Sequence, residues 1–313
     1  MSMVRDKVPR SGLPLELGLL PSRSSFLTWH RRPKLLDEAY SAGEGSYENF
    51  GIVVQGPVLR KHEFTFQTLL SYRRMFPGAR VVLSTWESQG VTAQWRDTFG
   101  EAGIQLVESP QPQEKGHSNF NLQLKSSIAG LAALQEYGVE FAVKQRTDQR
   151  IYNKFALSYL EASLKLIKAR DGNARLFSSS LNSFLGRPYG LSDMFQFSTL
   201  EEVTRYWSVP QAVGPHRYPN PGGHNFNESF LAFNYCASRT KSGTPPDWEE
   251  ALSEFFGIVD HSTLDMYWPK YSRREYLWRR YAESELEELT HSRWLSIVAK
   301  YDEDRSRWRP DKV

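Results

Sequence analysis

The sequence predicts an α/β protein in which helices pack on an open, mostly parallel β-sheet. Three observations lead to this prediction. Short apolar runs of strand length alternate along the chain with longer segments whose apolar residues recur at helical spacing. The first two runs are joined by a connection long enough for a right-handed parallel crossover. At least four strands alternate with helices in this way, which is the pattern of one large sheet.

The regular pattern begins at Asn49. The stretch NFGIVVQGPV predicts a buried strand at residues 51–54 that ends in a Gln-Gly-Pro turn. Residues 63–75 carry apolar side chains on or near one helical face, and a Pro-Gly pair ends this predicted helix. The stretch ARVVLSTW, residues 79–86, predicts a second buried strand, so the three elements form a parallel crossover unit.

The same alternation continues beyond this unit. The predicted elements are, in order, a helix at 93–102, a strand at 104–108, a helix at 119–137, a strand at 139–143, a helix at 153–170, strands at 176–180 and 193–198, and helices at 200–207, 227–237 and 247–256.

These elements divide the chain into three expected parts. An extended arm at 1–48, rich in Pro, Ser and Gly, precedes a sheet-containing domain at 49–260. A helical extension at 261–313 follows it. This extension interleaves aromatic residues with a basic cluster, which is Lys270, Arg273, Arg274, Arg279 and Arg280. Such a segment suits packing on its own domain, which we favour, or peripheral contact with anionic lipid headgroups.

The composition restricts the class of protein. Of the 313 residues, 40% are hydrophobic and 24% are charged, which is ordinary for a globular protein. The net charge of +3 is too small to indicate a nucleic-acid partner. Cys236 is the only cysteine, so an internal disulfide and a thiolate zinc cluster are excluded. The sequence shows neither a signal-peptide pattern nor an apolar run of about eighteen residues, and we expect a cytoplasmic protein.

Polar residues stand at the ends of three predicted strands. They are Gln55, Gly56 and Pro57 after the first strand, Ser84, Thr85 and Trp86 at the end of the second, and Lys144, Arg146 and Asp148 after the fourth. Because the carboxyl ends of parallel strands line one ligand crevice, we expect these residues to lie together. Their amide, hydroxyl, indole, cationic and carboxylate groups suit a base, a ribose and phosphates. The sequence contains no P-loop and no GxGxxG motif, which disfavours an ATPase or a dinucleotide enzyme.

Asp148 has two interpretations. It can form a structural ion pair with Arg146 or Arg150 near the next helix. Alternatively it reaches a divalent metal or a ribose while Lys144 and Arg146 contact phosphate oxygens. A single carboxylate can suffice for Mg²⁺ or Mn²⁺ when phosphate oxygens and water complete the shell.

The predicted helix at 119–137 begins with a group of amides. Asn119 is expected to be its N-cap, and Asn121 and Gln123 lie in the first turn, where unpaired backbone N–H groups favour an anion. Capping alone explains Asn119. For the other two amides, a sugar or phosphate contact and a purely structural role are both open.

Five blocks of the sequence together resemble one known family, the WavE family of lipopolysaccharide-synthesis proteins. The blocks are NFGIVVQGPV, FPGARVVLSTWE, NFNLQLKSSIAGL, FAVKQRTDQRIY and LSDMFQFSTLEEVTRYW. The resemblance covers about residues 49–280. It implies a GT-A-like fold and a glycosyltransferase of surface-polysaccharide assembly. The implied ligands are a nucleotide-sugar donor and a glycan or lipid-linked glycan acceptor, which suits the inner face of the membrane.

The resemblance also implies roles for residues. The Gln55–Pro57 turn would line the nucleotide pocket with the Ser84–Trp86 segment beside it, and Arg146 and Asp148 would take the place of the acidic motif that holds a metal and the ribose. A usual motif has two aspartates separated by one residue, whereas here the first of them is Arg146. This departure puts a Mn²⁺ or Mg²⁺ ion at Asp148 in doubt, because the arginine can itself neutralise the charge of a leaving group.

Two acids are candidates for the catalytic base. Transfer of a sugar with inversion requires a carboxylate that takes the proton of the acceptor hydroxyl. Asp193 lies in GLSDMF and Glu228 in GGHNFNESF. Each acid also has a purely structural interpretation. Asp193 can be a turn residue, and Glu228 can be a first-turn acid that complements a helix dipole. We prefer Asp193 as the base and assign Glu228 to the acceptor site or to an alternative base.

Two other functions remain open at this stage. One is a non-catalytic protein that binds a nucleotide sugar or carbohydrate on the same fold, which the replacement of one of the two aspartates by Arg146 favours. The other is a phosphoryl- or nucleotidyltransferase, which ranks lower because the sequence lacks a phosphate-cradling loop.

Overall fold

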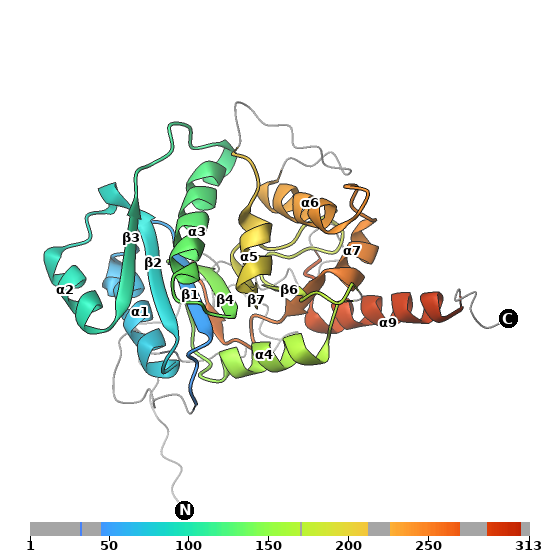
Figure 1. Ribbon diagram of the computed structural model, residues 1–313, viewed down its shortest axis with the longest axis horizontal. Coiled ribbons are helices and arrows are strands. Elements are labelled where there is room, and N and C mark those ends of the chain that lie inside the picture. Colours follow the sequence, from blue (N-terminus) through green and yellow to red (C-terminus); the bar gives the residue numbers. More distant parts are fainter. Residues whose placement is uncertain (1–31, 33–44, 170, 212–225, 270–286, 308–313) are drawn as a thin grey trace, which may run out of the picture.

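The structure is a computed structural model that describes residues 32, 45–169, 171–211, 226–269 and 287–307. A seven-stranded sheet with the order β3-β2-β1-β4-β7-β6-β8 crosses its centre (Figure 1). Its strands are β1 (Phe50–Gln55), β2 (Arg80–Trp86), β3 (Ile104–Ser109), β4 (Phe141–Arg146), β6 (Leu176–Ser179), β7 (Phe195–Thr199) and β8 (Phe256–Val259). Strand β7 runs antiparallel to both neighbours, and the other pairings are parallel. The predicted open, mostly parallel mixed sheet is therefore confirmed.

A small second sheet lies beside the main one. It consists of β5 (Arg150–Ile151) and β9 (Met266–Tyr267), which pair antiparallel. This pairing joins residues more than a hundred positions apart. Because β5 lies just after β4, the pairing brings the segment after β9 next to the end of β4.

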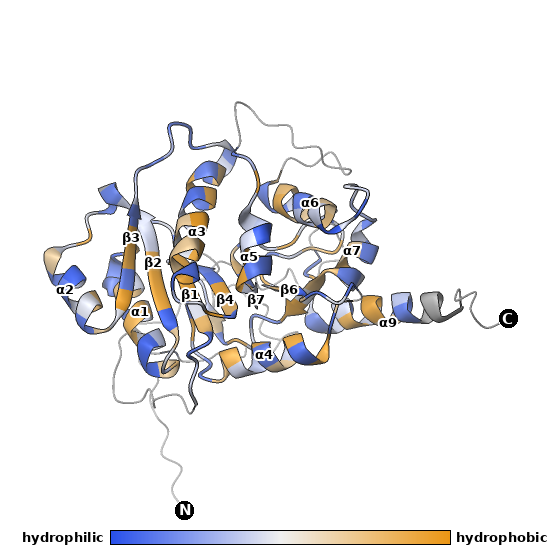
Figure 2. Ribbon diagram, viewed as in Figure 1, coloured by the Kyte–Doolittle hydropathy of each residue, from blue (hydrophilic) through white to orange (hydrophobic). Residues whose placement is uncertain are grey.

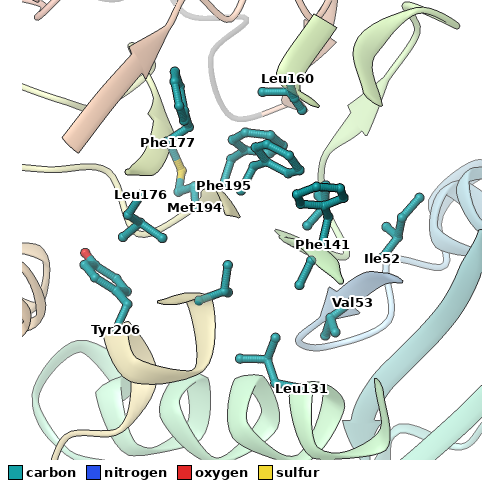
Figure 3. Close-up of a cluster of buried hydrophobic side chains, with 14 of the residues drawn as sticks. Ile52, Val53, Leu131, Phe141, Leu160, Leu176, Phe177, Met194, Phe195 and Tyr206 are labelled. Carbon is teal, nitrogen blue, oxygen red and sulfur yellow. The ribbon is translucent and has the colours of Figure 1, made fainter. Parts of the chain in front are cut away.

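Helices cover both faces of the main sheet. The helices are α1 (Phe64–Met75), α2 (Ala93–Glu101), α3 (Phe120–Gln135), α4 (Ala156–Leu166), α5 (Leu200–Trp207), α6 (Asn227–Arg239), α7 (Trp248–Glu254) and α9 (His291–Arg307), with short 3₁₀ turns at η3 (Lys61–Glu63), η4 (Glu87–Gln89) and η5 (His117–Asn119). Leu131 of α3 and Tyr206 of α5 enter the core from one face, and Leu160 of α4 enters it from the other (Figure 3).

The strands form because their residues are apolar on both faces, as expected of strands covered by helices on each side. All six residues of β1 are buried. Figure 2 shows hydrophobic residues concentrated along the strands, whereas the connection from β3 to α3 is hydrophilic. Helix α3 packs closely on this sheet because Gly130 has no side chain. A Cβ atom there would lie 2.4 Å from Cγ1 of Val53.

Most predicted elements occur within a few residues of their expected bounds. Strand β4 continues to Arg146, beyond the predicted end at 143. Strand β8 was not predicted, because its FGIV run is too short to be distinguished from the end of the preceding helix. The predicted helical extension at 261–313 is wrong at Met266 and Tyr267, which form β9.

The end of the chain packs on the sheet domain. Trp294 of α9 is fully buried, and its Nε1 donates a hydrogen bond of 3.0 Å to the main-chain oxygen of Leu252 in α7. This contact shows that α9 packs on the domain, and the packing of the aromatic and basic segment stays a prediction. The basic cluster at 270–280, like nearly all of the arm at 1–48, lies outside the described residues. No helix in the described part of the chain has the length and apolar character needed to cross a membrane.

Candidate active site

The ends of β1, β2 and β4 meet at one edge of the sheet, as predicted. Gln55 at the tip of β1 pairs with Ser84 of β2 on one side and with Arg146 of β4 on the other. In Figure 1 the start of α3 lies at the end of the sheet where β2 and β3 terminate. The polar ends of the three strands therefore lie side by side.

The side chains at the tips of β1 and β2 bond to neighbouring protein groups. Oε1 of Gln55 accepts a hydrogen bond of 2.7 Å from Ser126 Oγ, and Ser84 Oγ donates to the main-chain oxygen of Ser126 at 2.7 Å. Thr85 Oγ1 donates to the main-chain oxygen of Gly56 at 2.9 Å. These bonds fix the strand tips to α3 and to the turn after β1.

The residue that follows β4 holds the turn after β1 in place. Gly56 has a φ of +121°, which favours glycine, and Thr147 Oγ1 donates a hydrogen bond of 2.6 Å to the main-chain oxygen of Pro57. Trp86 is buried, with 3% of its surface exposed. None of the six residues predicted at the ends of β1 and β2 lines the pocket that lies next to them.

This pocket has a volume of about 300 Å³ and lies between the end of β4, the start of β7 and the N-termini of α3 and α6. Its lining residues are His117, Ser118, Gln123, Arg146, Asn182, Asp193, Met194, Phe226, Asn227, Glu228 and Trp268. Its size is at the lower end of the range for small-molecule sites. Four predicted site residues share it, namely Gln123, Arg146, Asp193 and Glu228.

Arg146, which lines the pocket, forms a two-point ion pair with Asp148. Nε of Arg146 lies 2.8 Å from Oδ1 of Asp148, and Nη2 lies 2.9 Å from Oδ2. The indole Nε1 of Trp268 donates to the same Oδ2 at 2.9 Å, and the guanidinium lies 5.5 Å from the centroid of the Trp268 ring. Two parallel N–H···O bonds set the plane of the guanidinium as well as its position.

These contacts bear on the metal that the resemblance implies. Both carboxylate oxygens of Asp148 already accept hydrogen bonds from Arg146, and one also accepts from Trp268. A carboxylate has about four acceptor positions, and these bonds occupy three of them. A Mg²⁺ or Mn²⁺ ion bound to Asp148 would therefore compete with Arg146 and Trp268 for the same oxygens. The residues around Asp148 therefore do not fit the implied ion.

Asp193 and Glu228 form an acidic pair on the pocket wall. Desolvation and the nearby negative charge of Asp193 together raise the pKa of Glu228 from its ordinary value of 4.5 to about 7. Nδ2 of Asn182 lies 3.4 Å from Oε1 of Glu228. Glu228 stands in the first turn of α6, so its place was predicted from its position in the sequence, but its raised pKa was not.

Lys144 lies beneath the pocket rather than in it. Its side chain is fully buried, and Nζ donates a hydrogen bond of 2.6 Å to the main-chain oxygen of Asp193. The same ammonium group lies 4.0 Å from the centroid of the Trp207 ring. Burial lowers its pKa from 10.5 to about 7. Lys144 thus supports the segment that carries Asp193.

The start of α3 differs from its prediction. Asn119 precedes the helix, but it adopts a left-handed conformation with φ of 64° and its side chain makes no capping hydrogen bond. The expected side-chain cap is therefore wrong. Nδ2 of Asn121 donates to the main-chain oxygen of Glu114 at 3.0 Å, so this amide supports the preceding loop. Gln123 reaches the pocket, where Nε2 lies 3.5 Å from the main-chain oxygen of Asp193.

Several lining residues were not predicted from the sequence. They are Ser118, Asn182, Met194, Phe226, Asn227 and Trp268. Trp268 reaches the pocket only because β9 pairs with β5, and nothing near it in the sequence indicates that pairing. For Asn182 the sequence offers only a weak signal, since asparagine is a common residue in tight turns. In the structure it has a positive φ of 67°, which asparagine tolerates.

Comparison with known proteins gives one family and several solved structures. A family model described as WavE lipopolysaccharide synthesis matches residues 50–212. No curated protein matches the sequence.

Three similar structures have TM-scores between 0.34 and 0.40. A cytidylyltransferase from Leptospira borgpetersenii is 11% identical, with a TM-score of 0.38, and the match covers 85% of this chain and 98% of that one. TarS residues 1–349 of S. aureus are 12% identical, with a TM-score of 0.40, over 84% and 73%. A glycosyltransferase involved in glycosylation of the major capsid of PBCV-1 is 14% identical, with a TM-score of 0.34, over 68% and 82%.

Proposed function

The chain belongs to the WavE lipopolysaccharide-synthesis family, and from this premise we propose that it is a glycosyltransferase that moves a sugar from a nucleotide-sugar donor to a hydroxyl of a surface glycan. The acceptor would be a growing glycan, free or linked to a lipid. Family membership supports a role in glycan synthesis, and the pocket supports the transfer chemistry.

One observation carries the proposal, which is that a single pocket is lined by a cation and by a pair of carboxylates. Arg146 lines it together with Asp193 and Glu228. Sugar transfer from a nucleotide needs positive charge beside the departing phosphate and a base beside the attacking hydroxyl. The N-termini of α3 and α6 also face the pocket, where backbone N–H groups favour an anion.

We assign the role of base to Glu228 rather than to Asp193, the residue preferred from the sequence. A general base works best when its pKa is near the working pH, and the pKa of Glu228 is about 7. The charge of Asp193 contributes to this value, so Asp193 would make Glu228 more basic. In this proposal the two acids act as a unit, with Glu228 taking the proton.

Arg146 would hold the donor. Its bidentate pair with Asp148 fixes the guanidinium plane at the pocket wall. An arginine placed this way can donate hydrogen bonds to the phosphate that leaves with the nucleotide. Phe226, Met194 and Trp268 give the same pocket an apolar and aromatic surface that a sugar ring or a base can contact.

Incubation of the purified protein with UDP-, GDP-, CDP- and dTDP-sugars tests the proposal, with release of the nucleoside diphosphate as the readout. We expect release with at least one donor and a loss of roughly 10²–10⁴-fold in Glu228→Gln, because this variant keeps the shape but not the base. Glu136→Gln, on the exposed end of α3, is the matched control and should retain full activity.

The alternative is a protein that binds a nucleotide sugar without turning it over. It is favoured by the arginine that stands where the usual acidic motif has an aspartate. Binding of a nucleotide sugar with no product release, under conditions in which Glu228→Gln and the native protein behave alike, would establish this alternative.

A further inference from the structure

The environment of Asp148 leads to an inference about how the donor is bound, which rests on the proposed function. The carboxylate accepts three N–H groups at 2.8–2.9 Å, two from Arg146 and one from Trp268. Two of these bonds come from a guanidinium, and bidentate pairs of this kind are among the strongest hydrogen bonds in proteins. Asp148 is thus committed to orienting Arg146.

Arg146 retains donors for a ligand. A guanidinium has five N–H groups, of which one on Nε and one on Nη2 bond to Asp148. Within the described residues, Nη1 of Arg146 makes no hydrogen bond. Because the side chain lines the pocket and lies against Trp268, these remaining donors are held at the pocket wall.

We propose that Arg146, oriented by Asp148 and Trp268, replaces the divalent cation of the usual two-aspartate motif, so that this protein binds its nucleotide donor without a metal. Arg146 provides the positive charge and the fixed N–H groups for the diphosphate. The N–H groups at the starts of α3 and α6, which face the same pocket, provide further donors.

Calorimetric titration of the full chain with UDP, GDP, CDP and dTDP tests this inference, once in EDTA and once with Mn²⁺. We expect the nucleotide that binds to do so with equal affinity in both buffers, within a factor of about two, because no step of binding needs an ion. Arg146→Met should weaken this binding roughly tenfold or more through loss of charge-assisted hydrogen bonds. Arg80→Met is the matched control. Arg80 is the first residue of β2, at the opposite end of the strand from Trp86, so this variant should bind the nucleotide normally.

Arg146→Asp gives the sharpest variant, because it creates the two-aspartate pattern with Thr147 between the acids. We expect this variant to lose binding in EDTA and to recover part of it in Mn²⁺. Its circular-dichroism spectrum and melting temperature, compared with those of Arg146→Met, distinguish this effect from misfolding.

Electron paramagnetic resonance of Mn²⁺ alone gives a readout that does not depend on a nucleotide. We expect the native protein and Asp148→Asn to leave Mn²⁺ equally free. Mn²⁺ binding that Asp148→Asn abolishes, or native nucleotide binding that EDTA abolishes and Mn²⁺ restores, would overturn the inference while leaving the proposed function intact. If none of the four nucleotides binds in either buffer, the proposed function fails, and the inference fails with it.

Discussion

The ammonium group of Lys144 donates a hydrogen bond of 2.6 Å to the main-chain oxygen of Asp193, beneath the floor of the pocket. A lysine that is fully buried is rare unless its charge is balanced, and here burial lowers its pKa from 10.5 to about 7. The hydrogen bond ties β4 to the start of β7, and it sets the backbone from which the Asp193 side chain enters the pocket.

This relationship predicts how stability depends on pH. Between the folded pKa of about 7 and the ordinary value of 10.5, the unfolded chain binds a proton on Lys144 that the folded chain does not bind. The free energy of unfolding should therefore rise with pH in this window, by at most on the order of 1.4 kcal/mol per pH unit from this group. Lys144→Met should lack this contribution.

Urea unfolding of the native protein and of Lys144→Met across that pH window checks this prediction. The stability difference between the two proteins should change steadily with pH, in favour of the native protein at high pH. A difference that stays constant from neutral to alkaline pH would show that Lys144 does not change its protonation on folding.

The raised pKa of Glu228 predicts the pH dependence of activity. A base works in its ionised form, so kcat/KM should rise with pH and level off above about 7. Replacement of the neighbouring acid by Asp193→Asn removes a negative charge that raises this pKa. The rising limb should then move to lower pH in this variant. Steady-state rates measured over the acidic and neutral range give the two midpoints, and coincident midpoints would contradict the pairing of these acids.

The indole N–H of Trp268 is predicted to hold the Arg146–Asp148 pair in place. Trp268→Phe keeps an aromatic ring but loses the 2.9 Å hydrogen bond to Asp148. We expect a severalfold rise in the KM for the donor with a smaller change in kcat, in keeping with the loss of roughly one hydrogen bond to a charged group. Trp248→Phe is the matched control, because the indole N–H of Trp248 makes no hydrogen bond within the described residues. Equal donor KM values for the two variants would show that Trp268 has no positioning role.

The sequence was sufficient to predict the strands of the main sheet other than β8, because the signals of those strands are local. The run at β1 is apolar on both faces, and it ends at Gly56, which permits a positive φ, and at Pro57, whose ring fixes φ. Because the carboxyl ends of parallel strands meet at one end of a sheet, Gln55 and Arg146 were expected to lie close together, although their direct pairing was not predicted. The meeting of strand ends was therefore predictable.

The side-chain contacts of the site were only partly predictable, for physical reasons. Short polar side chains at strand ends, such as Ser84 and Thr85, can bond to the nearest backbone carbonyl, and the sequence pattern does not show whether they do. Arg146 and Glu228 are longer and charged, and both reach the pocket. Trp268 depends on the β5–β9 pairing, which is too short to produce a periodic pattern.

The roles proposed for Arg146 and Glu228 predict different kinetic defects. Arg146→Met should mainly raise the donor KM, since the arginine is proposed to bind the diphosphate in the ground state as well as in the transition state. Glu228→Gln should mainly lower kcat, since a proton moves only in the reaction itself. Both parameters come from one set of initial rates over a range of donor concentrations.

The most direct test of the account is the rate at which the purified native protein releases nucleoside diphosphate from its preferred nucleotide sugar, compared with the rate of Glu228→Gln under the same conditions. If Glu228 is the catalytic base, we expect measurable turnover by the native protein and a loss of roughly 10²–10⁴-fold in the variant. Equal rates in the two proteins, with the variant folded and able to bind the nucleotide, would contradict it.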